Sequence, residues 1–144
     1  MLQRSERCDR DDPEQIVDVG SGAGLPGVAI AVVLPDWPLV LCEPNEKKSA
    51  FLFEMKRSLS LECEVYPLPV ERLVKDRGHT FGHAVTRATF DAAVWATMGR
   101  RLVKSSGLIW FMLNAGQKPA SQGAWSWAYS LPSGKSRRIE ALSV

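Results

Sequence analysis

The residues best suited to carry chemistry form one short run, Asp18-Val-Gly-Ser-Gly-Ala-Gly24. The run begins inside an apolar stretch, Ile16 to Val19, and is followed by another, Val28 to Leu34. Glycines at alternate positions let the backbone turn sharply, so a ligand can lie against bare main chain at the start of a helix. The pattern predicts a strand, a ligand-binding turn and a helix.

Two classes of nucleoside cofactor fit this turn. The segment Gly22-Ala-Gly24-Leu-Pro-Gly27 matches the dinucleotide pattern G-x-G-x-x-G, which makes an NAD- or FAD-binding oxidoreductase the second candidate. Asp18 favours S-adenosylmethionine, because a buried carboxylate needs a partner and the ammonium group of the methionine moiety would supply one. A dinucleotide has no cation at that place. We therefore expect S-adenosylmethionine as the cofactor.

Glu43 is the second candidate binding residue. It ends the next compact apolar run, Leu39 to Glu43, about 20 residues beyond the glycines. An acidic residue at this place accepts hydrogen bonds from ribose hydroxyls in both cofactor classes. Glu43 therefore indicates nucleoside binding without choosing between the two.

The elements that must position these residues alternate in type. We expect a helix capped by Asn45, with Phe51, Leu52, Met55 and Leu59 on its buried face. The other expected helices cover 28–34, 70–75 and 92–103, the strands cover 16–19, 39–43, 63–68, 82–85 and 107–116, and Pro-Ser-Gly at 132–134 marks a closing hairpin. This order predicts a Rossmann-like α/β three-layer sandwich, mostly parallel with a C-terminal antiparallel hairpin, as in class I methyltransferases.

Size and composition predict one cytoplasmic domain over residues 1–144, with 1–15 as a polar lead segment. The chain is 45% hydrophobic, so it can bury a core without disulfides or metal. The sequence contains no stretch of about 18 uncharged apolar residues, so no membrane span is predicted. Cys8, Cys42 and Cys63 lack metal-ligand spacing, so we expect reduced cysteines and no metal site. With a net charge of only +2, nucleic-acid contact would need a local patch.

Taken together, these motifs resemble one family, the bacterial small-subunit ribosomal RNA guanine-N7 methyltransferases, historically called glucose-inhibited division protein B. The matching segments are VDVGSGAGLPGVAIAVVLP (17–35), LCEPNEKKSAFL (41–52), VER (70–72) and TRA (86–88). The resemblance implies an S-adenosylmethionine-dependent methyltransferase that acts, as a monomer, on ribosomal RNA or the small ribosomal subunit. It implies guanine N7 in small-subunit ribosomal RNA as the methylated atom.

The resemblance also implies roles for individual residues. Val70 and Glu71 would border the adenine, and Arg87 would stand at the pocket mouth, where its planar fork could orient the guanine edge or grip a phosphate. A structural salt bridge is the alternative role for Arg87. Glu43 would hold the ribose hydroxyls, and the turn residues Gly20, Ser21, Gly22, Ala23 and Gly24 would wrap the methionine and ribose.

The chain departs from the family pattern in several places. Only about 15 polar residues precede the glycine motif, where the family usually carries an N-terminal helical region, so the chain resembles a short form. Pro69 stands in place of an arginine, His83 in place of an acidic residue, and Asn114 with Ala115 in place of lysine and glycine. These departures keep open a third possibility, a catalytically inactive cofactor-binding or ribosome-associated module.

Other residues could serve RNA binding or simple structure. Guanine N7 has no proton to remove, so no general base is required, and we expect His79 and His83 in a loop and at a strand edge. Tryptophan at apolar positions usually packs in the core. We therefore favour core packing over base stacking for four residues, Trp95, Trp110, Trp125 and Trp127. Three basic clusters could form an RNA-facing patch: Lys47 and Lys48; Arg100, Arg101 and Lys104; and Lys135, Arg137 and Arg138.

Overall fold

The computed structural model describes residues 13–87, 89–114, 116–117 and 125–144, and thus not Cys8, Ala88, Ala115 or most of the lead segment. The strands are β1 (Ile16–Val19), β2 (Leu39–Cys42), β3 (Cys63–Tyr66), β4 (Phe81–Arg87), β5 (Val103–Asn114), β6 (Trp125–Ser130) and β7 (Ser136–Ser143). The helices are α1 (Gly27–Val33), α2 (Glu46–Ser58), α3 (Val70–Arg77) and α4 (Ala92–Leu102). None of these helices is long and apolar enough to cross a membrane.

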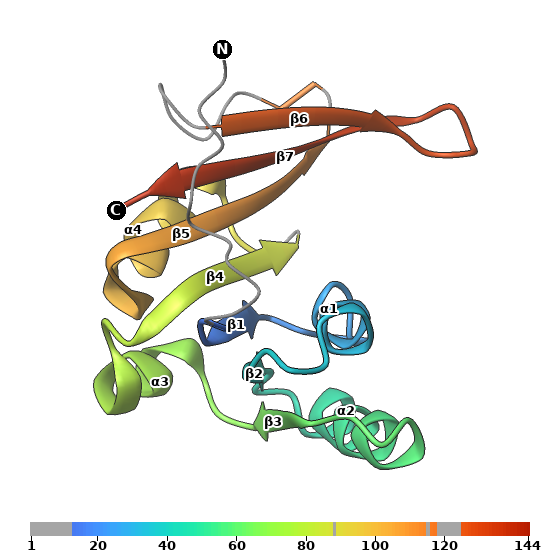
Figure 1. Cartoon of the computed structure of the whole chain (residues 1–144), viewed down its shortest axis with the longest axis vertical. Coiled ribbons are helices and arrows are strands. Elements are labelled where there is room, and N and C mark those ends of the chain that lie inside the picture. The colour runs from blue at the N-terminus through green and yellow to red at the C-terminus, as the bar shows by residue number, and fades with distance from the viewer. Residues whose placement is uncertain (1–12, 88, 115, 118–124) are drawn as a thin grey trace.

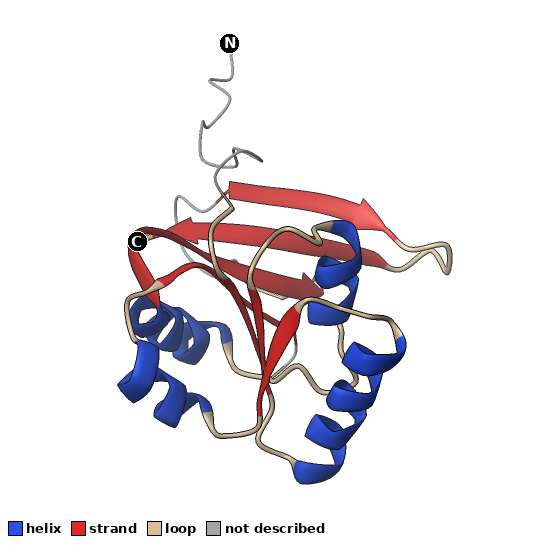
Figure 2. Ribbon diagram, turned by 60° about the horizontal axis from the view of Figure 1, so that its bottom comes forward, coloured by secondary structure: helices blue, strands red, loops and turns tan. Residues whose placement is uncertain are grey.

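All seven strands form one sheet in the order β3-β2-β1-β4-β5-β7-β6, with β3 at one edge and the hairpin strand β6 at the other (Figure 1). The pairs among β1 to β5 are parallel, whereas β7 pairs antiparallel with both β5 and β6. Helices lie on both sides of the strands (Figure 2). The predicted three-layer fold with a closing antiparallel hairpin is confirmed.

The strand order also bears on the choice of cofactor class. Dinucleotide-binding folds of this kind have the order 3-2-1-4-5-6. Here an antiparallel strand, β7, lies between β5 and β6. The topology therefore does not favour the NAD- or FAD-binding alternative, although the glycine spacing permits it.

The core divides into two clusters, one on each face of the sheet. Val17 and Val19 of β1 pack with α3 and α4, whereas Ile16 packs with α1 and α2. This division follows from the strand period of two residues, which sends successive side chains to opposite faces. Cys42 and Cys63 are free thiols buried in these clusters, and burial raises the pKa of Cys42 to about 12. Both therefore serve packing in the reduced state.

The face of α2 differs from its predicted one. Leu52 is fully buried, but Phe51 is 45% exposed and Leu59 is 47% exposed. Phe51 and Leu52 are neighbours in the chain, so their side chains point about 100° apart around the helix axis. They therefore cannot both face the sheet, and Leu52 is the one that does. Leu59 caps the helix after Ser58. The helix also ends earlier than the apolar pattern suggests.

Two expectations about aromatic residues are wrong. Trp95 is core, at 1% exposure, but Trp125 and Trp127 are 44% and 51% exposed because β6 is the outermost strand of the sheet. His83 is not at a strand edge; it is buried within β4, between β1 and β5, where its Nδ1 accepts a hydrogen bond from Trp110 Nε1 at 3.2 Å. His79 lies in the turn before β4, as expected.

The two leucines of the α2 region provide a matched test of this packing. Leu52→Ala should lower the free energy of unfolding by about 2–5 kcal/mol, because it leaves a cavity under a fully buried side chain. Leu59→Ala should cost less than about 0.5 kcal/mol, as is usual for surface changes. Urea denaturation of both variants measures the difference. Equal losses would contradict the orientation of α2.

Candidate functional site

The turn between β1 and α1 is built from glycines in conformations that other residues rarely adopt. Gly20, Gly22 and Gly24 have φ angles of +72°, +56° and +90°. The amides of Gly20 and Ser21 both donate to the carbonyl oxygen of Cys42, at 2.8 and 3.2 Å. A Cβ atom on Gly20 would collide with Thr89, which follows β4. The turn therefore passes close over the ends of β2 and β4.

Asp18 is completely buried beneath this turn, and it has a partner within the protein. Its Oδ2 accepts a hydrogen bond from the amide of Gly27 at 2.9 Å, and its main-chain oxygen accepts one from Ser21 Oγ at 2.9 Å. Burial raises the pKa of Asp18 to about 6, against the lowering effect of the Gly27 bond. Oδ1 has no hydrogen-bond partner among the described residues. That oxygen fits a cationic donor, so Asp18 suits the predicted ligand ammonium.

Glu43 connects the turn to the start of α2. Its Oε2 accepts from the amide of Gly22 at 2.9 Å, and its Oε1 accepts from the amide of Asn45 at 3.0 Å. The side chain of Asn45 in turn caps the helix by accepting from the amide of Lys48, as the sequence predicted. Each carboxylate oxygen has a second lone pair, so Glu43 retains the capacity to accept from a ribose diol.

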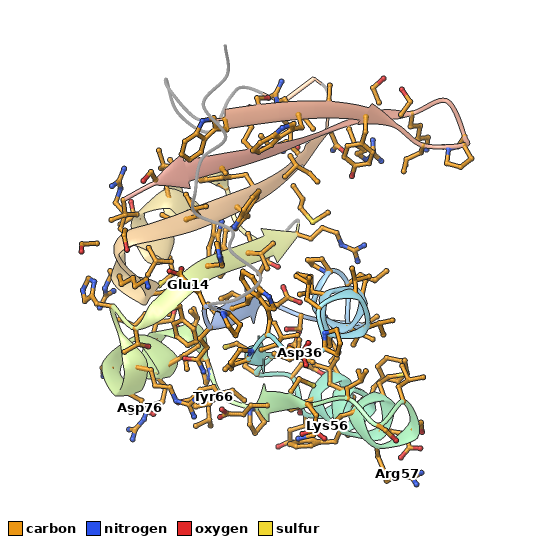
Figure 3. All side chains as sticks on the ribbon, in the orientation of Figure 1. Glu14, Asp36, Lys56, Arg57, Tyr66 and Asp76 are labelled. Atoms are coloured by element: carbon orange, nitrogen blue, oxygen red, sulfur yellow. The ribbon has the colours of Figure 1, made fainter. Side chains whose placement is uncertain are left out.

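Helix α3 holds Val70 and Glu71 at the same edge of the sheet. Val70 is buried and Glu71 is exposed at the first turn of the helix. The far end of α3 is tied to β3, because Tyr66 donates its hydroxyl to Asp76 at 2.7 Å, as the labelled side chains in Figure 3 illustrate. This bond holds the pKa of Asp76 below its usual range. The helix is thus anchored at the end away from the predicted adenine site.

Arg87 is the exposed last residue of β4, and it makes no ion pair with the other residues that the structure describes. Burial raises the pKa of the Asp18 carboxyl, and the positive charge of Arg87 partly opposes that rise. The structural salt bridge considered for Arg87 is therefore not present among the described residues. Its guanidinium is available to a ligand beside the turn.

A cavity of about 530 Å³ opens beside Arg87 at the ends of β4 and β5. Phe90 and Trp95 form part of its wall with their rings nearly parallel, at 8° and 5.9 Å between centroids. The other lining residues are Thr86, Ala92, Phe111, Met112, Leu113, Asn114, Gln117, Tyr129, Leu131 and Arg137. Sequence reasoning did not assign Phe90, Gln117 or Tyr129 to a site, because they come from three separate segments without a shared motif.

The three predicted basic clusters do not converge on this cavity. Lys47 and Lys48 lie at the start of α2, on the site edge, and Arg137 of the third cluster lines the cavity itself. Arg100 and Arg101 are in the last turn of α4, whose first turn is the one near the cavity. Lys104 is paired with Glu14 at 2.7 Å. The second cluster therefore lies at the opposite ends of the strands from the cavity.

The family model for rRNA small subunit methyltransferase G, GidB, matches residues 1–131. The chain belongs to the GidB family. A ribosomal RNA small subunit methyltransferase G from Burkholderia ambifaria is 40% identical over 101 residues, which are 68% of this chain and 44% of that protein. One from Thermosynechococcus vestitus is 32% identical over 127 residues, 88% of this chain and 53% of that protein. The GidB chain thus spans about half the length of these relatives.

Solved structures share the fold at low sequence identity. The TYW2 protein of M. jannaschii, solved with AdoMet, has a TM-score of 0.71 at 11% identity, covering 97% of this chain and 77% of that one. The O-methyltransferase TomG from Streptomyces achromogenes, solved with SAM, has a TM-score of 0.69 at 16% identity, covering 94% and 75%. These similarities establish a class I methyltransferase fold for this GidB family member.

The raised pKa of Asp18 predicts how stability depends on pH. The carboxyl has a pKa of about 6 when folded against 3.8 as a free group, so its contribution is fully present below pH 3.8 and is lost as pH rises through 6. Asp18→Asn should abolish that loss. As pH rises from 4 to 7.5, the free energy of unfolding of the variant should therefore increase, relative to that of the parent, by on the order of 3 kcal/mol.

Chemical denaturation of both proteins across this range measures the difference. His83, whose pKa is lowered by burial, affects stability in the opposite direction as pH falls, but it titrates in both proteins and cancels. Parallel stability curves for the parent and Asp18→Asn would contradict the assignment.

Proposed function

We propose that this chain binds S-adenosylmethionine and methylates guanine N7 in small-subunit ribosomal RNA. One observation carries the proposal: in a GidB family chain, the glycine turn, Glu43 and a cavity lined by Arg87 meet at one edge of the sheet. The relatives are named as methyltransferases of small-subunit ribosomal RNA, which supports the RNA substrate, and the solved neighbours were determined with AdoMet or SAM, which supports the cofactor. Methyl transfer needs a cofactor site, here the turn with Glu43, directly beside an acceptor site, here the cavity.

The cofactor would occupy the turn and its flanking strand ends. Asp18 would accept from the ammonium group, Glu43 would accept from the ribose hydroxyls, and Val70 with Glu71 would border the adenine. The turn residues Gly20, Ser21, Gly22, Ala23 and Gly24 would lie against the ligand, since they leave main chain uncovered. When bound, this cofactor supplies an electrophilic methyl group on sulfur.

The acceptor guanine would enter the cavity beside Arg87. Phe90, whose ring is backed by the buried Trp95, offers an apolar surface to a base, and Asn114 with Arg137 offers polar atoms to its edges. Because N7 carries a free lone pair, catalysis needs positioning and no general base. Positioning of reactants is worth roughly 7–11 kcal/mol in well-oriented systems. Arg87 would contribute by gripping a phosphate or a base edge.

Cofactor binding is tested with Glu43→Gln. The exchange keeps one acceptor oxygen but removes the charge, and hydrogen bonds to charged groups contribute about 1.5–3 kcal/mol, so affinity for S-adenosylmethionine should fall about tenfold or more. Glu62→Gln, an exposed change outside the site, is the control and should bind normally. Calorimetric titration of each with S-adenosylmethionine and with NAD measures this. Binding of NAD without S-adenosylmethionine would overturn the cofactor assignment.

Substrate contact is tested with Arg87→Ala. Single-turnover methyl transfer to small-subunit ribosomal RNA should fall at least about tenfold, while cofactor affinity and melting temperature change little, because the contact is made with RNA. Arg57→Ala, which removes an exposed arginine paired with Glu54 on α2, should leave transfer unchanged.

Each failure in these assays has a distinct meaning. Normal transfer by Arg87→Ala would remove its substrate role. Absence of transfer by the unaltered chain, on both naked RNA and assembled subunits, with normal cofactor binding would instead indicate the inactive binding module.

A further inference from the structure

Strand β6 presents a row of aromatic side chains to solvent. Trp125, Trp127 and Tyr129 alternate along the strand and are 44%, 51% and 38% exposed. Alternate residues of a strand share one face, so the three rings lie on the same side of the sheet. Trp110 of β5 extends the row inward, since its ring stacks on Trp127 at 6.0 Å between centroids and 24° between planes. We call these four residues the aromatic row.

The composition of the aromatic row favours a flat ligand with its own ring faces. Large exposed apolar patches on soluble proteins usually mark binding surfaces. The exposed members here are tryptophan and tyrosine rather than aliphatic residues, and aromatic rings on a sheet surface are a common means of stacking unpaired bases. Alternate residues are about 6.6 Å apart along a strand, close to twice the roughly 3.4 Å spacing of stacked bases along one strand of duplex DNA.

The aromatic row continues into the proposed acceptor cavity. Tyr129 belongs to both, and its partner across the hairpin, Arg137, also lines the cavity. Lys135 lies in the turn that joins β6 to β7, near the same end. Cations beside a series of aromatic rings are the usual composition of single-strand binding surfaces. The strand that places a guanine in the cavity would therefore meet the aromatic row next.

We propose that the aromatic row is a stacking platform for two or three unpaired nucleotides next to the methylated guanine. The proposal rests on the proposed function, which supplies the RNA strand. It implies a preference for single-stranded over duplex RNA, because bases in a duplex have their faces covered. Trp110 also lines an apolar groove of about 390 Å³ beside α1, so a protein segment is the rival occupant.

The test compares two double variants that each remove two exposed aromatic residues. Trp125→Ser with Trp127→Ser alters the aromatic row and leaves Tyr129 in the cavity wall. Phe51→Ser with Phe53→Ser, at 45% and 48% exposure on α2, is the matched control. Fluorescence anisotropy with a labelled single-stranded RNA of about 12 nucleotides, and with its duplex, measures affinity.

The tryptophan variant should bind the single strand about tenfold or more weaker, with duplex binding and cofactor affinity unchanged. Its KM for small-subunit ribosomal RNA should rise while kcat is kept. The phenylalanine variant should behave like the parent. If the tryptophan variant does not fold, Trp125→Ser alone should bind the single strand about fivefold more weakly than the parent.

Unchanged single-strand affinity and KM would overturn the platform, and if Arg87→Ala still lost activity the proposed function would stand without it. A shift of the tryptophan variant from dimer to monomer in light scattering, with RNA affinity unchanged, would identify a second copy as the occupant and also overturn the proposal. Weaker single-strand binding in a chain that never transfers methyl groups would keep the platform and reject the methyltransferase function.

Discussion

Two buried carboxylates hold the turn on which the rest of the site depends. The three left-handed glycines of this turn have no side chains to pack, so its shape depends on hydrogen bonds to its main chain and from the buried Ser21 hydroxyl. Asp18 binds the amide of Gly27 behind the turn, and Glu43 binds the amide of Gly22 at its tip. Both carboxylates are also the groups assigned to the cofactor. Holding the turn and binding the ligand therefore draw on the same two carboxylates, so affinity and local stability should be coupled.

Strand direction explains why the cavity forms where it does. Parallel strands bring the ends of β1, β2 and β4 to one edge of the sheet. Because β7 runs the other way, its first residues reach that same edge, where Arg137 pairs in register with Asn114. A sixth parallel strand would place its first residues at the far edge. The antiparallel hairpin is thus what adds Tyr129 and Arg137 to the wall that Arg87 begins.

Local patterns predicted the strand, turn and helix around Asp18, the cap at Asn45 and the closing hairpin, because each depends on neighbouring residues. Neighbours along the chain do not reveal which strand is outermost, and this is why Trp125 and Trp127 were assigned to the core. His83 was misplaced for the related reason that the centre of a sheet is defined by strands distant in sequence. The cavity likewise depends on four segments that meet only in the folded chain.

The basic residues are divided between the cavity end of the strands and the far end, and this division affects how RNA could be held. Arg100 and Arg101 lie in the last turn of α4, away from the cavity, so among the described residues an RNA strand there would meet few cations: Arg87, Arg137 and Lys135. Each phosphate neutralised on a single strand contributes about −0.7 to the slope of log affinity against log salt, so few contacts give a shallow slope. Affinity that survives added salt would then have to come from uncharged contacts, and exposed aromatic faces on β6 are the groups at this edge able to make them.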